Sequence, residues 1–324
     1  MSEPQSMSLP AEGKSAAPIH RFGHAGMGSI FEVLIAGKDP EYARHAADAA
    51  FEELDRLHRE LSRFEPSSEV SQINNLRAGQ YARVGIAVIE CLKMAEKVYA
   101  ETGGAFDVTI GSLLPCWRTD DRKPRTPTSE ELAAAKARTG MHLLDIRESE
   151  HMVGVRADGV RVDLGGIGKG YAVEQMAGVL KEWSIGTALL HGGMSSIQAM
   201  GAPPGRNAWK VSLGDPESDD AVIGAVRLRD RSMSASSCPG GIPRIIDPRT
   251  GRPAGIASGA AACTLGSWAA AASATLTDCL STAFLVLSPA EVEAYCRAHP
   301  DVSVILIVKD SGGRKTLRYG EWTE

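Results

Sequence analysis

Residues 162–174, VDLGGIGKGYAVE, place four glycines and a lysine directly before a segment with helical periodicity. Backbone amides at a helix N-terminus form a good seat for a phosphate group, and Lys169 would add a positive charge. The stretch is not a Walker A loop, because Lys169 is followed by Gly170 rather than Ser or Thr, and it is not a GxGxxG fingerprint. On these residues alone, a glycine-rich turn with a solvated lysine is an equally good interpretation.

Hydrophobic periodicity on both sides of this stretch predicts a mixture of helices and strands. Helices are predicted over residues 40–63, 85–104 and 273–288, after a Thr128–Glu131 capping box, and from the glycine stretch to Trp183. Strands are predicted over residues 29–37, 187–193, 209–216, 221–230 and 302–310. A hairpin turning at Asp158-Gly159 is predicted over 151–166, a strand-like segment over 103–117, and loops over 64–74 and 232–254. This mixture favours an α+β or mixed α/β fold over a regular βαβ repeat.

The composition argues against several classes of protein. The chain has 324 residues, enough for one large domain, and its formal net charge of -5 gives no basic field for nucleic acid or an acidic membrane. The first residues are polar, which predicts a disordered tail over 1–20 and a folded domain over 21–324. The apolar stretch 279–287 is too short to span a bilayer, and no signal-peptide pattern is present. We therefore expect a cytoplasmic protein without membrane insertion.

The six cysteines form no CxxC pair and match no zinc-site spacing. Three of them, Cys91, Cys279 and Cys296, lie in apolar helical patterns. Buried free thiols are the expected state of these side chains.

Two polar pairs are candidates for a functional site. Asp278 and Thr282 lie four apart in a predicted helix and share a face, so they offer the oxygen ligands that suit Mg²⁺ rather than zinc. An ordinary polar pair on a helix surface is the commoner explanation of such spacing. Asp107 and Thr109 alternate with apolar residues, so they either find structural hydrogen-bond partners or line a site.

The segment 244–253, RIIDPRTGRP, combines a turn with positive charge. Asp247 can cap the turn through its side chain. Arg244, Arg249 and Arg252 could bind phosphate groups, and a solvated basic turn is the alternative.

Taken in order, these segments resemble the ApbE family of FAD:protein FMN transferases. The matching segments are MGSIFEV, LSRFEPSSEVSQIN, GGAFDVTIGSLLPCW, VDLGGIGKGYAVE, GGMSSIQAMG, IIDPRTGRP and ATLTDCLSTAF. The resemblance runs from Met27 to Phe284 and implies an α+β, two-lobed, T-fold-related architecture with FAD in a cleft between the lobes. Residues 21–324 would form this ApbE-like flavin transferase domain.

The resemblance also implies an activity. Such a protein uses Mg²⁺ to split the diphosphate of FAD, passes FMN to a Ser or Thr hydroxyl of an acceptor protein, and releases AMP. The expected cofactors are therefore FAD and Mg²⁺, and the expected partner is the flavin-acceptor protein. The resemblance is also compatible with a homodimer.

By the family pattern, the metal ligands are the side chains of Asp278 and Thr282 and the backbone carbonyl of Gly168. Together with Arg244, the first two are the expected catalytic residues. The implied cofactor-binding residues are Met27, Phe64, Asp107, Asp163, Gly165, Gly166, Lys169, Ser236, Ser237 and Asp247.

Several positions depart from the family pattern. Phe64 replaces a tyrosine, Ala235-Ser236-Ser237 replaces TSG, GGMSSIQAMG differs from the common GGD form, and the segment 237–244 is short. Arg244 stands where the family commonly has a histidine that suits proton acceptance, and an arginine remains charged near neutral pH. A working transferase is the favoured hypothesis. The alternatives are an FAD-binding protein without transfer, such as a flavin carrier or assembly factor, and a slow hydrolase of FAD.

Overall fold

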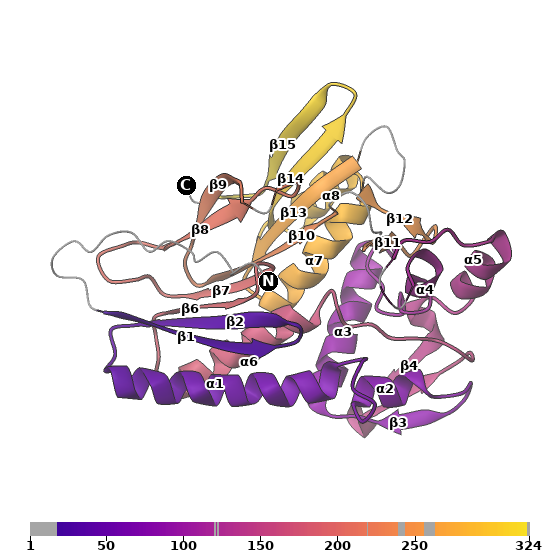
Figure 1. Ribbon diagram of the computed structural model, residues 1–324, viewed down its shortest axis with the longest axis horizontal. Coiled ribbons are helices and arrows are strands. Elements are labelled where there is room, and N and C mark those ends of the chain that lie inside the picture. The colour runs from indigo at the N-terminus through magenta and orange to yellow at the C-terminus, as the bar shows by residue number, and fades with distance from the viewer. Residues whose placement is uncertain are drawn as a thin grey trace.

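An eight-stranded antiparallel sheet forms the centre of the computed structural model, which describes residues 18–119, 121, 123–218, 220–238, 244–255 and 263–322 (Figure 1). Each strand pairs with its neighbours in antiparallel register. The strands, in spatial order, are β1 (Ile19–Gly26), β2 (Ser29–Ala36), β6 (Ala188–Gly192), β7 (Ser196–Met200), β10 (Arg231–Ser237), β13 (Cys263–Ala271), β14 (Ser303–Asp310) and β15 (Gly313–Tyr319).

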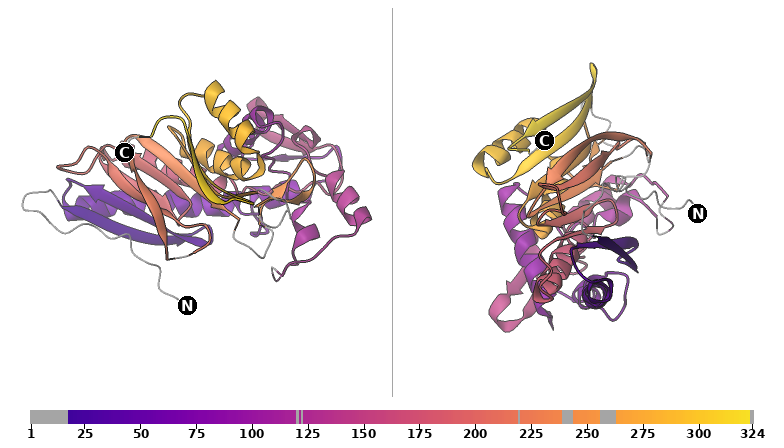
Figure 2. Two further views of the ribbon diagram at one scale, coloured as in Figure 1. Left: turned by 90° about the horizontal axis from the view of Figure 1, so that it is seen from above. Right: turned by 90° about the vertical axis from the view of Figure 1, so that its left-hand side faces the viewer.

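Helices cover one face of this sheet. The layer comprises α1 (Pro40–Leu61), α3 (Ile86–Glu101), α6 (Gly168–Glu182), α7 (Ala274–Val286) and α8 (Pro289–Ala298). In α1, Asp39 caps the first turn, and an apolar stripe that includes the fully buried Leu54 and Leu57 faces the core. The end-on view in Figure 2 shows α1 along its axis beside the first two strands. Burying each such leucine contributes about 1.5–3 kcal/mol.

A two-stranded hairpin covers the opposite face. Strands β8 (Trp209–Gly214) and β9 (Val222–Leu228) bury Trp209, Val211 and Leu213 on alternate positions of β8. These side chains pack in one cluster with Leu34, Leu189 and Ile305 of the central sheet. Because both faces of the sheet are covered, the side chains of its inner strands are largely buried on both sides.

Smaller elements lie beside the helical layer. They are α2 (Glu69–Asn74), α4 (Leu114–Trp117), α5 (Ser129–Lys136), the sheet of β3 (Tyr81–Arg83), β5 (Met152–Val155) and β4 (Leu144–Arg147), the pair β11 (Ile246–Asp247) and β12 (Arg252–Pro253), and two 3₁₀ turns, Met141–Leu143 and Glu148–Glu150. In the part of the chain that the structure describes, no helix is both long and apolar enough to cross a membrane.

The α+β class is confirmed. The predicted helices and the strands predicted over residues 29–37, 187–193, 209–216, 221–230 and 302–310 are present, with ends shifted by a few residues. The capping box is also present, since Thr128 accepts from the Glu131 amide and the Glu131 carboxylate accepts from the Thr128 amide. Cys91, Cys279 and Cys296 are buried free thiols, as expected. The division into two lobes stays a prediction. Strand β1 begins at Ile19, inside the predicted tail, whereas residues 1–17 lie outside the described residues.

Two of the predicted strand segments are wrong. Residues 151–166 do not form a hairpin, because β5 pairs with β3 and β4, and Arg161 instead bridges Ile110 in parallel. Residues 103–117 form turns and the short helix α4 rather than a strand. The carboxylate of Asp107 accepts hydrogen bonds from the amide and hydroxyl of Thr109, which bends the chain locally.

Two of the predicted loops contain regular structure. Within 64–74, Ser68 caps α2 by accepting from the Ser71 amide. Within 232–254, β10 runs through the middle of the sheet because neighbours satisfy its serine hydroxyls. Ser232 donates to Gln198, and Ser234 bonds to Thr277 of α7. The serine-rich composition therefore concealed a buried strand.

Candidate active site

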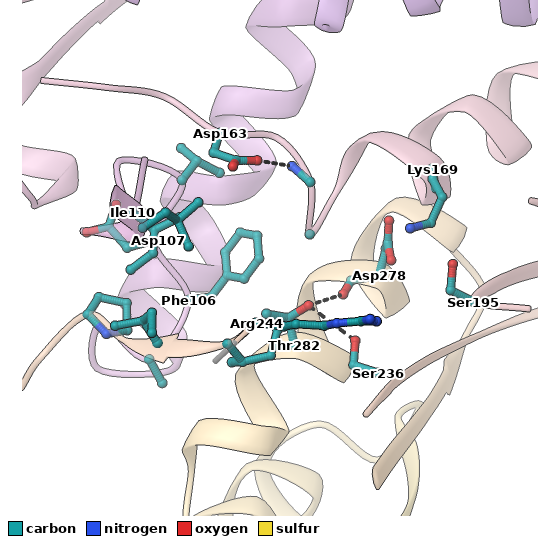
Figure 3. A pocket seen from close by; sticks show the side chains of 18 of the residues that line it. Phe106, Asp107, Ile110, Asp163, Lys169, Ser195, Ser236, Arg244, Asp278 and Thr282 are labelled. Atoms are coloured by element: carbon teal, nitrogen blue, oxygen red, sulfur yellow. Dashed lines mark hydrogen bonds between the residues drawn. The ribbon is translucent and has the colours of Figure 1, made fainter. Parts of the chain in front are cut away.

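A cavity of about 270 Å³ opens where α6, α7 and β10 meet the segment around Asp107 (Figure 3). Ten of the sequence-predicted site residues line it. They are Asp107, Asp163, Gly165, Gly166, Lys169, Ser236, Ser237, Arg244, Asp278 and Thr282. The cavity thus brings together five segments that are far apart in the sequence.

The glycine stretch that forms one wall of the cavity is fixed by hydrogen bonds and an ion pair to residues that do not line the cavity. The Asn74 side chain donates to the Val162 carbonyl at 2.9 Å and accepts from the Val162 amide at 2.6 Å. Asp163 Oδ1 accepts from the Gly165 amide at 2.7 Å, and Asp163 Oδ2 lies 2.9 Å from Nε of Arg63. These contacts fix the chain just before α6 begins at Gly168.

The same stretch packs closely against α7. The Gly170 amide donates to Asp278 Oδ2 at 2.8 Å. A Cβ atom on Gly170 would lie 2.2 Å from the Ala274 carbonyl oxygen and 2.6 Å from Cβ of Asp278. At Gly166, a Cβ would lie 3.2 Å from Thr282 Oγ1. Glycine at these two positions therefore lets the backbone approach the two polar side chains of α7.

Asp278 is a buried carboxyl beside a positive charge. It is 3% exposed, and burial raises its pKa, while the charge of Lys169, the Gly170 amide and the Ser196 hydroxyl act in the opposite direction. Figure 3 shows the Lys169 amine next to the Asp278 carboxylate. Because a buried carboxylate is costly without compensation, this position favours a bound cation or a proton.

Thr282 presents its hydroxyl one turn further along α7. Its Oγ1 lies 3.4 Å from the Asp278 carbonyl oxygen and 3.4 Å from Ser236 Oγ, and Ser236 also bonds to Ser281 at 2.9 Å. The structure therefore shows Asp278 and Thr282 as part of a polar cavity wall, not as a pair on a solvent-exposed helix surface.

Asp107 occupies the opposite wall. It is 5% exposed, and burial raises its pKa, whereas the hydrogen bonds from Thr109 lower it. Both interpretations of this residue hold, since Asp107 has structural hydrogen-bond partners and also lines the cavity.

Arg244 points into the cavity from the segment that precedes β11 (Figure 3). Of the three arginines of the basic turn, it alone lines the cavity. The Arg249 guanidinium pairs instead with Asp247 and Glu291. Residues 239–243, the middle of the segment predicted to be shortened, lie outside the described residues.

Four predicted site residues do not line the cavity. Asp247 accepts from the Arg249 amide, as predicted for the turn. Gly168 is buried at the start of α6, next to Lys169. Met27 lies in the β1–β2 turn, and its amide donates to His58. Phe64 is 71% exposed, but the guanidinium of Arg63 lies 4.3 Å from its ring centre while pairing with Asp163 in the cavity wall.

Sequence reasoning missed part of the lining. Ser195 follows β6 in the turn before β7, and its hydroxyl faces the cavity (Figure 3). The signal in the sequence is the GGMSS turn, which differs from the GGD form of the family. An apolar wall of Phe106, Ile110 and Ile245 was also missed, as was Arg118.

Comparison with known proteins identifies a family and several relatives. The family model described as "ApbE family" matches residues 27–306. A relative from Klebsiella pneumoniae (strain 342), named FAD:protein FMN transferase, is 27% identical over 303 residues, which cover 90% of this chain and 84% of the relative. A relative of the same name from Vibrio cholerae is 28% identical over 278 residues, covering 81% and 80%.

Solved structures show the same fold. The flavin transferase ApbE from Vibrio cholerae superposes with a TM-score of 0.79, covering 93% of this chain and 98% of that one, at 24% identity. The apo flavinyl transferase ApbE from Pseudomonas stutzeri gives a TM-score of 0.80, covering 95% and 96%, also at 24% identity.

Proposed function

This chain belongs to the ApbE family, and on that premise we propose that it is a transferase that moves FMN from FAD to a hydroxyl group of an acceptor protein. The observation that carries the proposal is the shared cavity. It joins the glycine stretch and Lys169 at the start of α6 with Asp278 and Thr282 on α7. Backbone amides and a lysine suit the diphosphate of FAD, and the hydroxyl of an acceptor can enter from the open side.

In the proposed reaction, the acceptor oxygen forms a bond to the phosphorus of the FMN half of FAD. The bond from that phosphorus to the bridging oxygen breaks, and AMP leaves with this oxygen. The proton of the acceptor hydroxyl passes to a phosphate oxygen, because Arg244 is charged and cannot accept it. Arg244 and Lys169 supply positive charge at the cavity, which suits a reaction that depends on positioning and charge neutralisation.

The cavity wall fits Mg²⁺. The wall offers the Asp278 carboxylate and the Thr282 hydroxyl, and the predicted third ligand is the carbonyl of Gly168, a residue that does not itself line the cavity. These donors are oxygens only, and Mg²⁺ binds through few protein ligands together with phosphates and water. A side chain at Gly166 would fill the space in front of the Thr282 hydroxyl. Among the described residues, no group of three or more His, Cys, Asp or Glu side chains could hold a metal ion, so a thiolate or histidine site is not formed there. Bound Mg²⁺ would neutralise charge that develops on the phosphoryl oxygens.

Several finer features of this function stay predictions. They are the Ser or Thr identity of the acceptor residue, the homodimer, the cytoplasmic location and the FAD cleft between two lobes. The roles of Met27 and Phe64 beside the flavin ring are predictions too.

The proposal is tested by following AMP release from FAD and Mg²⁺, with and without a peptide that contains a threonine acceptor. We expect acceptor-dependent AMP release together with fluorescent flavin on the peptide. AMP release without any acceptor requirement would identify a hydrolase. If the protein bound FAD but released no AMP with any acceptor tested, catalysis would be refuted. A flavin carrier would then be favoured, in line with Arg244 standing in place of a histidine base.

A further inference from the structure

Glu174, the last residue of the VDLGGIGKGYAVE stretch, lies outside the cavity and binds the N-terminus of α7. Its Oε2 accepts from the Ser273 hydroxyl at 2.8 Å, from the Thr275 amide at 2.8 Å and from the Thr275 hydroxyl at 2.6 Å. Ser273, the N-cap residue of α7, accepts in turn from the Leu276 amide at 3.1 Å. The first turn of α7 is therefore capped twice, by its own serine and by a carboxylate from α6.

This contact is one of three that repeat at similar steps. Gly166 lies opposite Thr282, Gly170 opposite Asp278 and Ala274, and Glu174 opposite Ser273 and Thr275. Each step advances four residues along the α6 segment and returns three or four along α7. Because four residues make roughly one helical turn, the two segments run antiparallel in a defined register.

The three contacts hold this register in different ways. At Gly166 there is no side chain to resist sliding, and at Gly170 a single amide bonds to Asp278. One carboxylate oxygen of Glu174 accepts three hydrogen bonds from Ser273 and Thr275, and hydrogen bonds to a charged group are roughly twice as strong as neutral ones. A slide of α7 along α6 would break all three and would move Asp278 and Thr282 together relative to Gly168.

We propose that Glu174 is a positioning residue that sets the register of α7 against the glycine stretch, and thereby places the oxygen donors of Asp278 and Thr282. The proposal rests on the transferase function and the Mg²⁺ site proposed above. Glu174 acts through α7 and touches no reacting group.

The test compares Glu174→Ala and the milder Glu174→Gln with a matched capping control, Asp39→Ala. Asp39 accepts from the amides of Glu41 and Tyr42 at the start of α1. This cap lies at the opposite end of α1 from Arg63, roughly 30 Å away along a helix of this length. Each variant is measured for its melting temperature, for the Mg²⁺ concentration that gives half-maximal stabilisation of the FAD-bound protein, and for kcat and KM of AMP release.

We expect Glu174→Ala to raise the half-maximal Mg²⁺ concentration about 10- to 100-fold, as is typical when a group that orients metal ligands is lost. It should also lower kcat with little change in KM for the acceptor. Glu174→Gln should give a smaller shift in the same direction and keeps the test open if the alanine variant fails to fold. The Asp39→Ala variant should have a lower melting temperature and an unchanged half-maximal Mg²⁺ concentration.

A double-mutant cycle with Thr275→Val tests the route of the effect. If Glu174 acts through the start of α7, its replacement should change the Mg²⁺ response less in the Thr275→Val background than in the wild type. An unchanged Mg²⁺ response in both Glu174 variants, or full additivity, would overturn the positioning role alone. A wild-type protein that shows neither AMP release nor Mg²⁺-dependent stabilisation would overturn the proposed function and this proposal with it.

Discussion

Replacing Gly170 by alanine should push α6 and α7 apart, displace the cavity wall and lower the activity. The added Cβ would lie 2.2 Å from the Ala274 carbonyl oxygen, about 0.8 Å inside the 3.0 Å that such contacts keep. It would also lie 2.6 Å from Cβ of Asp278. Because one of these atoms belongs to the backbone of α7, no rotation of a side chain relieves the clash, and the helix itself has to move.

The size of the effect follows from this displacement. Overpacking of a closely packed contact typically costs about 1–3 kcal/mol of folding free energy. A shift approaching 1 Å at a reacting group costs about 100-fold in rate. Gly170→Ala should therefore lose about 1–3 kcal/mol of stability and about two orders of magnitude of AMP release.

Gly178→Ala is the matched control because it lies in the same helix, and a Cβ there meets nothing within 4 Å. Alanine in an open helix interior is favoured over glycine by about 1 kcal/mol, so this variant should be slightly more stable and fully active. Thermal unfolding and AMP release, measured on both variants, test whether the close contact at Gly170 places Asp278. If Gly170→Ala kept wild-type activity, or if the two variants changed alike, the close contact would not be what places Asp278.

Three further substitutions test individual side chains. Asp278→Ala should lower AMP release about 10²–10³-fold, the typical cost of losing a charge-stabilising group, and Mg²⁺-independent activity of that variant would contradict its assignment as a ligand. Arg244→His should raise the transfer rate, because a neutral histidine ring can accept the proton of the acceptor hydroxyl. The rate should then increase with pH through about 6.5, the ordinary pKa of histidine. A flat pH profile would argue against a base at this position. Phe64→Ala should leave the melting temperature nearly unchanged, since Phe64 is 71% exposed. It should weaken FAD binding up to about tenfold if the ring stacks on the flavin. An unchanged FAD affinity in a fluorescence titration would exclude that contact.

Local signals in the sequence predicted the helices that form the candidate site. The α7 helix follows from its apolar periodicity, and its four-residue spacing correctly placed Asp278 and Thr282 on one face. The glycine stretch correctly marked the start of α6. Helix periodicity and capping are properties of neighbouring residues, so they are visible without the fold.

Long-range features were missed, and the reasons are physical. Ser195 reaches the cavity because β7 pairs with β10, and the Ala235 amide donates to the Ser195 carbonyl at 2.7 Å. The strand character of β10 depends on Thr277 and Gln198, which satisfy serine hydroxyls from distant parts of the chain. Asp107 and Thr109 satisfy each other in a turn, which alternation of polar and apolar residues cannot distinguish from a strand.

The glycines of the opening stretch thus have two requirements to meet. Binding an anion at a helix N-terminus asks only for exposed amides, and this would not require glycine at position 170, which lies inside α6. The close contact at Gly170 comes from α7 instead, and the one at Gly166 comes from Thr282 of α7 together with Phe106. Glycine at these sites therefore follows from helix packing against Asp278 and Thr282, and Glu174 one turn later bonds to the same helix. One stretch of thirteen residues thus contains both the proposed diphosphate-binding site and the contacts that hold α7 beside it, which is why it is the most informative part of the sequence.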